Sequence, residues 1–211
     1  MMLEDRIRAQ FPTLVVTLLS VLIALAFSDL VELARARMML WPLNIGTLRT
    51  WGQIFAMGSC AFSVWVIFAH IGVSRLRIPT LADSVVVFVV PLAILFGNSL
   101  TGLKDIWPWF YFASFYLFIS LLAWCWQVRI ALAESELASF ARLTSPLGPL
   151  AVLYVGIPFY AAAGWADSHG HLAPAAETLI AMTASPAAWL TAWLFVREWH
   201  QAIALAQSTG A

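Results

Sequence analysis

Six long apolar stretches constrain this chain more than any other feature of its sequence. They cover residues 11–34, 51–73, 79–100, 107–128, 147–165 and 177–201. An α-helix needs about 20 mostly apolar residues to cross the hydrocarbon core of a bilayer. None of the stretches alternates apolar and polar residues with the period of two that a membrane β-barrel strand requires. The sequence therefore predicts an all-α fold, a polytopic membrane bundle of about six transmembrane helices.

The composition leads to the same class of protein. Of the 211 residues, 62% are hydrophobic and only 10% are charged, whereas soluble domains carry about 25% charged residues. Because so few polar residues cannot cover a water-exposed globule, we expect the lipid bilayer as the surroundings of the chain. We predict one transmembrane domain over residues 1–211. Its first apolar stretch is too long for a cleavable signal peptide and is expected to remain as a span.

Several classes of cofactor and partner lack a signature. The formal net charge is zero, and no basic cluster is dense enough for a nucleic-acid partner. No apolar stretch contains a lysine for a retinal Schiff base or a central histidine pair for haem, and no nucleotide-binding motif is present. We therefore predict no haem, retinal or nucleotide, and the cofactor is unknown.

The positive residues predict an orientation. One side of the predicted membrane collects Arg6, Arg8, Arg75, Arg77, Arg129, Arg142 and Arg197, and the other collects Arg35, Arg37, Arg49 and Lys104. Cytoplasmic loops carry the excess of arginine and lysine, so both termini are expected in the cytoplasm. The chain has the general look of a bacterial inner-membrane protein, which is the predicted location.

Two stripes of small residues predict close helix packing. They consist of Gly52, Ala56, Ser59 and Ser63 in the second stretch and of Ala181, Ser185, Ala188 and Ala192 in the sixth. Small side chains allow helix backbones in lipid to approach and gain van der Waals contact. The stripes could face each other within one chain or face another subunit. The predicted partners are accordingly a second copy in a homo-oligomer or the subunits of a larger membrane complex.

Ionisable side chains inside a membrane are costly and therefore indicate function. Asp29 and Glu32 lie three positions apart on one helix face, where they could bind a cation or relay a proton. Alternatively they pair with Arg35 or Arg37 at the interface. Asn98 could line a polar pathway or bond to a neighbouring helix.

A second polar group is expected on the cytoplasmic side. It comprises His70, Asp83, Arg197, Glu198 and His200. Histidine titrates near neutral pH, so a proton-linked role is conceivable, and Arg197 with Asp83 would form a buried ion pair. The alternative is that these charges extend to interfacial water without a function.

A weak metal motif lies between the fifth and sixth stretches. Asp167, His169 and His171 have side chains that bind divalent metals. Because a fourth ligand is missing and glycine makes the segment flexible, a solvated loop is the preferred interpretation. We predict no confident metal site.

Proline spacing raises the question of an internal repeat. Pro12, Pro79 and Pro91 recur as Pro108, Pro174 and Pro186. A three-span unit repeated once would be inverted in the membrane, as in many transporters. Chance spacing among the ten prolines is the alternative.

Together these features favour a small oligomeric channel or transporter. The alternative is a non-catalytic accessory or scaffold subunit of a larger membrane complex. A membrane-embedded enzyme is a third hypothesis, for which the sequence provides no catalytic constellation and no catalytic residue is predicted.

Overall fold

The computed structural model describes residues 3–36, 44–74, 81–133 and 149–208. Within these ranges the chain forms six α-helices and no strand. They are α1 (Leu3–Ala36), α2 (Ile45–Ser74), α3 (Leu81–Ser99), α4 (Trp107–Ala133), α5 (Pro149–Ser168) and α6 (Pro174–Ser208). The predicted all-α class and the count of about six helices are confirmed.

The lengths and surfaces of these helices are those of a membrane protein. By length and composition four of them can cross a bilayer, over Thr13–Ala36, Ile45–His70, Leu150–Ser168 and Pro174–Glu198. Within the described residues α3 and α4 contain the shorter apolar segments Phe88–Ser99 and Trp107–Ala123. Large apolar side chains cover the outside of the bundle, as shown by Val155 and Leu179, which are 69% and 67% exposed. Such a surface is stable in lipid and not in water.

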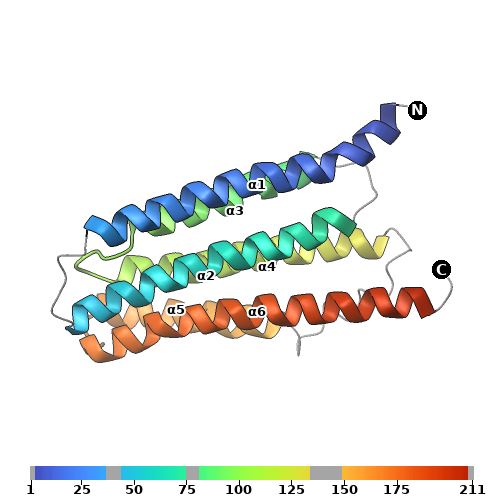
Figure 1. Ribbon diagram of the computed structural model, residues 1–211. Helices are drawn as coiled ribbons and strands as arrows, with labels where there is room; N and C mark the ends of the chain where they lie inside the picture. Colours follow the sequence, from blue (N-terminus) through green and yellow to red (C-terminus); the bar gives the residue numbers. More distant parts are fainter. Residues whose placement is uncertain (1–2, 37–43, 75–80, 134–148, 209–211) are drawn as a thin grey trace.

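The six helices form two layers of three (Figure 1). One layer has the order α1–α2–α6 and the other the order α3–α4–α5, with α3 behind α1 and α5 behind α6. The most extensive contact joins α2 to α6, and the next joins α4 to α5. Although α4 lies behind α2, the described residues of these two helices do not approach each other closely. The middle of the bundle is therefore the place where a cavity can form.

The packing of the two halves of the chain differs. In the first half the backbones of α1 and α3 lie close together, whereas in the described residues those of the corresponding helices α4 and α6 do not. The structure thus adds no support to the predicted repeat of a three-helix unit. The helices continue through Pro91, Pro158 and Pro186, which all lie inside them.

Parts of the segments between the first and second and between the fourth and fifth apolar stretches, residues 37–43 and 134–148, lie outside the described residues. Next to these gaps the chain is helical, apart from Asn44. α1 includes Arg35, α2 already begins at Ile45, and α4 continues to Ala133. Arg49 therefore belongs to a long helix and not to a loop, which decides its role below.

Candidate functional site

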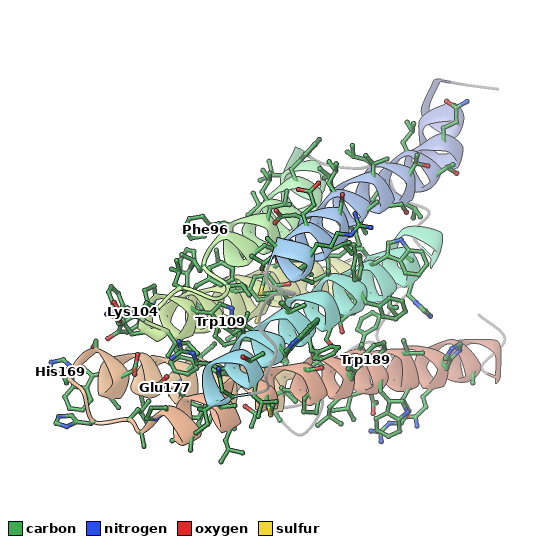
Figure 2. The ribbon with its side chains drawn as sticks, turned by 60° about the vertical axis from the view of Figure 1, so that its left-hand side comes forward. Phe96, Lys104, Trp109, His169, Glu177 and Trp189 are labelled. Carbon is green, nitrogen blue, oxygen red and sulfur yellow. The ribbon has the colours of Figure 1, made fainter. Side chains whose placement is uncertain are left out.

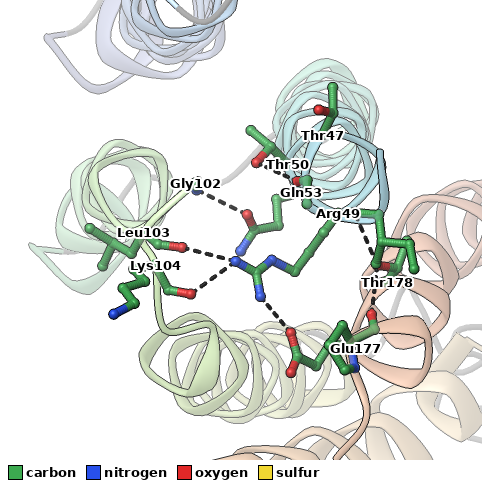
Figure 3. A network of polar contacts seen from close by, with 12 residues as sticks. Thr47, Arg49, Thr50, Gln53, Gly102, Leu103, Lys104, Glu177 and Thr178 are labelled. Carbon is green, nitrogen blue, oxygen red and sulfur yellow. Dashed lines mark hydrogen bonds and ion pairs between the residues drawn. The ribbon is translucent and has the colours of Figure 1, made fainter. Parts of the chain in front are cut away.

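Polar side chains gather at the end of the bundle where α2 and α6 begin. We define this distal-end cluster as the side chains of Arg49, Gln53, Asp167 and Glu177 together with the backbone of residues 100–107. Arg49 Nη1 donates to Glu177 Oε2 at 2.5 Å, and Arg49 Nη2 donates to the carbonyl oxygen of Lys104 at 2.9 Å (Figure 3). One guanidinium therefore joins α2, α6 and the connection that leads into α4.

The local sequence explains why these two charges meet. Asn44 Oδ1 accepts the backbone N–H of Thr47 at 2.9 Å, which caps the first turn of α2 and places Arg49 in its second turn. Pro174 opens α6, at a helix position that needs no N–H donor. Glu177 then falls in the first turn of α6, where the helix dipole stabilises a negative charge.

Two further contacts tie the connection and α5 to this cluster. The backbone N–H of Gly102 donates to Gln53 Oε1 at 2.9 Å, and Gly102 has a φ of +73°, a conformation that favours glycine. The Asp167 carboxyl group lies beside the Glu177 carboxyl group, near Arg49 and the backbone of Trp107. Two carboxyl groups in contact need a proton or a cation nearby, and Arg49 provides the cation.

The ion pair at the centre of the cluster is largely shielded from solvent. The exposed fraction of the Arg49 side chain is 18%, and that of Glu177 is 9%. An ion pair in such surroundings is screened little, and removing one partner leaves the other charge without compensation. The pair is therefore expected to hold α2 and α6 together more strongly than a surface salt bridge would.

A cavity of about 520 Å³ lies between the α2–α6 pair and the α4–α5 pair. Its lining extends along α4 from Trp109 to Ala123, a length of about 21 Å at 1.5 Å per residue. Apolar side chains make up most of the wall, and Trp109 and Tyr160 line the part toward the distal-end cluster. The volume lies within the range of about 300–1,000 Å³ that is usual for ligand sites.

Several hydroxyl groups of this cavity already have partners, whereas Trp109 Nε1 has none among the described residues. Ser63 Oγ donates to the carbonyl oxygen of Ala188 at 3.1 Å, and the hydroxyl groups of Tyr160 and Thr183 lie 3.1 Å apart. Thr191 Oγ1 donates to a carbonyl oxygen of its own helix at 2.9 Å. The lining formed by the described residues therefore suits an apolar molecule better than a hydrated ion.

The two small-residue stripes lie against each other where α2 meets α6. Ser59 Oγ and Ser185 Oγ are 2.7 Å apart, and the bond from Ser63 to the backbone of Ala188 follows one turn later. At Gly52 the helices are so close that an added Cβ would lie 3.2 Å from a side-chain carbon of α6. The stripes position the distal-end cluster, because they set the register of α2 on α6.

The predicted acidic pair and Asn98 lie in different surroundings. Asp29 and Glu32 are exposed on α1, and in the described part of the chain neither lies in the cavity or in the distal-end cluster. Asn98 is buried, and its Nδ2 donates to the carbonyl oxygen of Ala26 at 3.0 Å. The amide thus bonds α3 to α1, which is one of the two roles expected for it.

At the opposite end of the bundle, part of the predicted cytoplasmic group is close together. The rings of His70 and His200 are 6.1 Å apart, edge to face. Arg197 pairs with its neighbour Glu198 at 2.6 Å. The side chain of Asp83 lies outside the described residues, so its predicted pairing with Arg197 stays a prediction.

The weak metal motif is divided between two surroundings. Asp167 is in the last turns of α5 and contacts Glu177, whereas the imidazole of His169 lies against Trp165 with ring centroids 4.7 Å apart. The ring of His171 stacks on that of His169 at 6.2 Å. Across the described ranges no three His, Cys, Asp or Glu side chains come together as a possible metal site.

Sequence reasoning did not identify the Arg49–Glu177 pair. It assigned Arg49 to a connector and used it only for the orientation of the chain. A signal was nevertheless present, because Arg49 precedes Gly52 by one turn and Glu177 precedes Ala181 by one turn. Extending the two facing stripes by one turn brings these opposite charges together.

Figure 2 shows how the polar end of the molecule is arranged, with Lys104, Trp109, His169 and Glu177 toward one end and Trp189 farther along α6. No protein-family model, no curated protein and no solved structure matches this chain. The cavity and the distal-end cluster are therefore the features of this chain that indicate a function.

Proposed function

We propose that this membrane protein is a small transporter that binds a hydrophobic molecule inside the bilayer. The observation that carries the proposal is the apolar cavity of about 520 Å³ between the α2–α6 and α4–α5 pairs. Lipid tails are as apolar as the cavity wall, so shape and van der Waals contact, and not the hydrophobic effect, select what enters. An elongated molecule that fits the length of the cavity is the expected cargo.

The lining favours such a cargo over an ion. A conducted ion needs backbone carbonyls or charged side chains along its path, whereas several hydroxyl groups here are already bonded to their own or a neighbouring helix. A channel for ions through a single chain is therefore the less favoured form of this proposal. An ion channel would instead need a path between the chains of a homo-oligomer. Native mass spectrometry of the purified protein measures the number of copies and so tests this alternative.

The orientation of the chain is part of the proposal. We place both termini in the cytoplasm of a bacterium, so that the distal-end cluster faces the outside of the inner membrane. The arginine distribution supports this placement. Reporter fusions to the C-terminus that are active only in the cytoplasm or only outside it test the orientation directly.

Cavity filling tests the proposed function. Ala113 and Ala184 line the cavity, so the change of both to Leu removes room for a ligand. Ala162→Leu is the matched control, since Ala162 is exposed on α5 and does not line the cavity. The proteins are purified in mild detergent, and bound molecules are measured by native mass spectrometry.

We expect a bound hydrophobic molecule in the wild type and in Ala162→Leu, and its loss from the Ala113→Leu/Ala184→Leu variant. If the wild type carries nothing beyond detergent under conditions that retain lipids, the proposal is wrong. The same holds if the filled variant retains as much ligand as the control.

A further inference from the structure

Three buried nitrogen atoms near the distal end lack a hydrogen-bond acceptor. They are Arg49 Nε, Gln53 Nε2 and Trp109 Nε1, none of which is bonded in the part of the chain that the structure describes. A buried donor without an acceptor costs free energy comparable to that of a lost hydrogen bond, so such atoms are rare in proteins. The whole residues Gln53 and Trp109 are each only 1% exposed.

These donors belong to the same part of the bundle. Arg49 and Gln53 lie one turn apart on α2, and both reach the connection between α3 and α4. That connection leads directly into the first turn of α4, which contains Trp109. Trp109 also lines the cavity, and Gln53 lies one turn before the first α2 residue of its wall. Trp109 thus lies in the cavity wall near one end of the bundle (Figure 2), and Arg49 and Gln53 lie in the polar network next to the start of the wall (Figure 3).

The fourth buried atom without a partner is of a different kind. Asn98 Oδ1 is an acceptor, and the amide that carries it is bonded to α1. Among the described residues, the buried N–H donors without an acceptor therefore all belong to α2 and α4. An acceptor-bearing group placed there would satisfy several of these donors at once.

The charges around these donors limit what that group is. The positive charge of Arg49 is already paired with Glu177, and Asp167 adds a second carboxyl group beside it. An anionic group would meet these carboxyl groups at close range, which is unfavourable in a site of low dielectric constant. A neutral oxygen acceptor avoids this repulsion and still accepts from the N–H groups.

We propose that the cavity binds a single-chain lipid whose neutral carbonyl oxygen accepts hydrogen bonds from Trp109 and Gln53. The apolar chain lies along α4 toward Ala123, and the carbonyl lies at the distal end. This inference rests on the proposed function and adds the class of the cargo. Long-chain esters and long-chain ketones both carry such a neutral carbonyl oxygen.

The test compares three unbranched probes of nearly equal length. Methyl myristate carries a neutral ester, myristic acid carries an ionisable group, and hexadecane carries no acceptor. Each is added at the same mole fraction to the wild-type protein in detergent, and its bound fraction is measured by native mass spectrometry. One hydrogen bond is worth about 1 kcal/mol, so with two such bonds the ester should bind roughly thirtyfold more tightly than the alkane. The ionised acid should bind more weakly than the ester.

The variant Trp109→Phe removes the indole N–H and keeps an aromatic ring. It should lower the preference for the ester roughly fivefold while hexadecane still binds, which shows that the cavity remains. Trp107→Phe, two positions earlier and 41% exposed, is the matched control and should keep the preference. Gln53→Met provides a second variant in case Trp109→Phe does not fold.

The outcomes separate this inference from the proposed function. If ester and alkane bind equally well to the wild type, or if neither Trp109→Phe nor Gln53→Met changes their ratio, the carbonyl site is wrong but the cavity still binds apolar molecules. If the acid binds more tightly than the ester, the preference for a neutral head is refuted. If none of the probes binds, the proposed function itself fails.

Discussion

The distal-end cluster makes an asymmetric prediction about the ion pair between Arg49 and Glu177. Arg49→Met removes the cation that lies beside the Glu177 and Asp167 carboxyl groups, together with the bonds to the connection before α4. Glu177→Gln is milder, because its side-chain oxygen still accepts from Arg49 and Asp167 remains as a nearby carboxyl group. The first change should therefore destabilise the protein much more than the second.

The magnitudes follow from the burial of the pair. Removing one partner of a buried ion pair costs about 3–5 kcal/mol, and since Arg49 is 18% exposed we expect the lower end, about 3 kcal/mol. Glu177→Gln should cost about 1 kcal/mol, the usual net value of one hydrogen bond. Arg35→Met is the matched control, because Arg35 is exposed on α1, and its effect should stay within about 0.5 kcal/mol.

The assay is reversible unfolding in mixed micelles of increasing denaturing-detergent content, followed by tryptophan fluorescence. Lowering the pH should restore part of the stability lost in Arg49→Met, since protonating one carboxyl group removes the repulsion between the two. The reasoning is refuted if Glu177→Gln costs as much as Arg49→Met. It is also refuted if the stability of Arg49→Met does not rise as the pH falls.

Three further changes test the packing around the site. Gly97→Ala should destabilise the protein by about 1–2 kcal/mol, because the added Cβ would overlap the ring of Phe112. The higher helix propensity of alanine offsets only part of this strain. An unchanged unfolding midpoint would contradict the prediction. Gly102→Ala should cost about 1 kcal/mol through its positive φ and should weaken ligand binding at the distal end, measured by native mass spectrometry. Ser59→Ala should cost only about 0.6 kcal/mol, the average value of a hydrogen bond between membrane helices. Ser185→Ala should cost the same, because it removes the same bond. A loss of stability above about 2 kcal/mol in either variant would contradict this expectation.

The sequence predicted the helices well because hydropathy alone determines them in lipid. The ends of the helices were harder to predict, and α2 shows why. It begins at Ile45 and not near Trp51, since its first turns contain Thr47 and Thr50, which hydropathy assigns to a loop. Both threonines are buried in the structure, so tertiary packing and not local polarity decides where this helix starts.

The candidate site could be predicted only in part. Arg49 and Glu177 are separated by 128 positions, and only the register of α2 on α6 brings them together. The cavity has no sequence signal at all, because it arises where α2 and α4 lie opposite each other without close approach. The unpaired nitrogen of Trp109 likewise depends on what surrounds it, and a tryptophan near a predicted helix end is ordinarily assigned to the membrane interface.

Arg49 and Glu177 are synthesised at different times, because 128 positions separate them in the sequence. Helices enter the membrane in the order in which the ribosome produces them, so Arg49 reaches the bilayer well before Glu177 exists. Until α6 arrives, Arg49 lacks the carboxylate that compensates its charge in the finished bundle. A nascent chain that stops before α6 lacks this partner, although it contains Asp167 of α5. The contact between Arg49 and Glu177 can therefore form only after α6 has been made, so it belongs to the last stage of assembly.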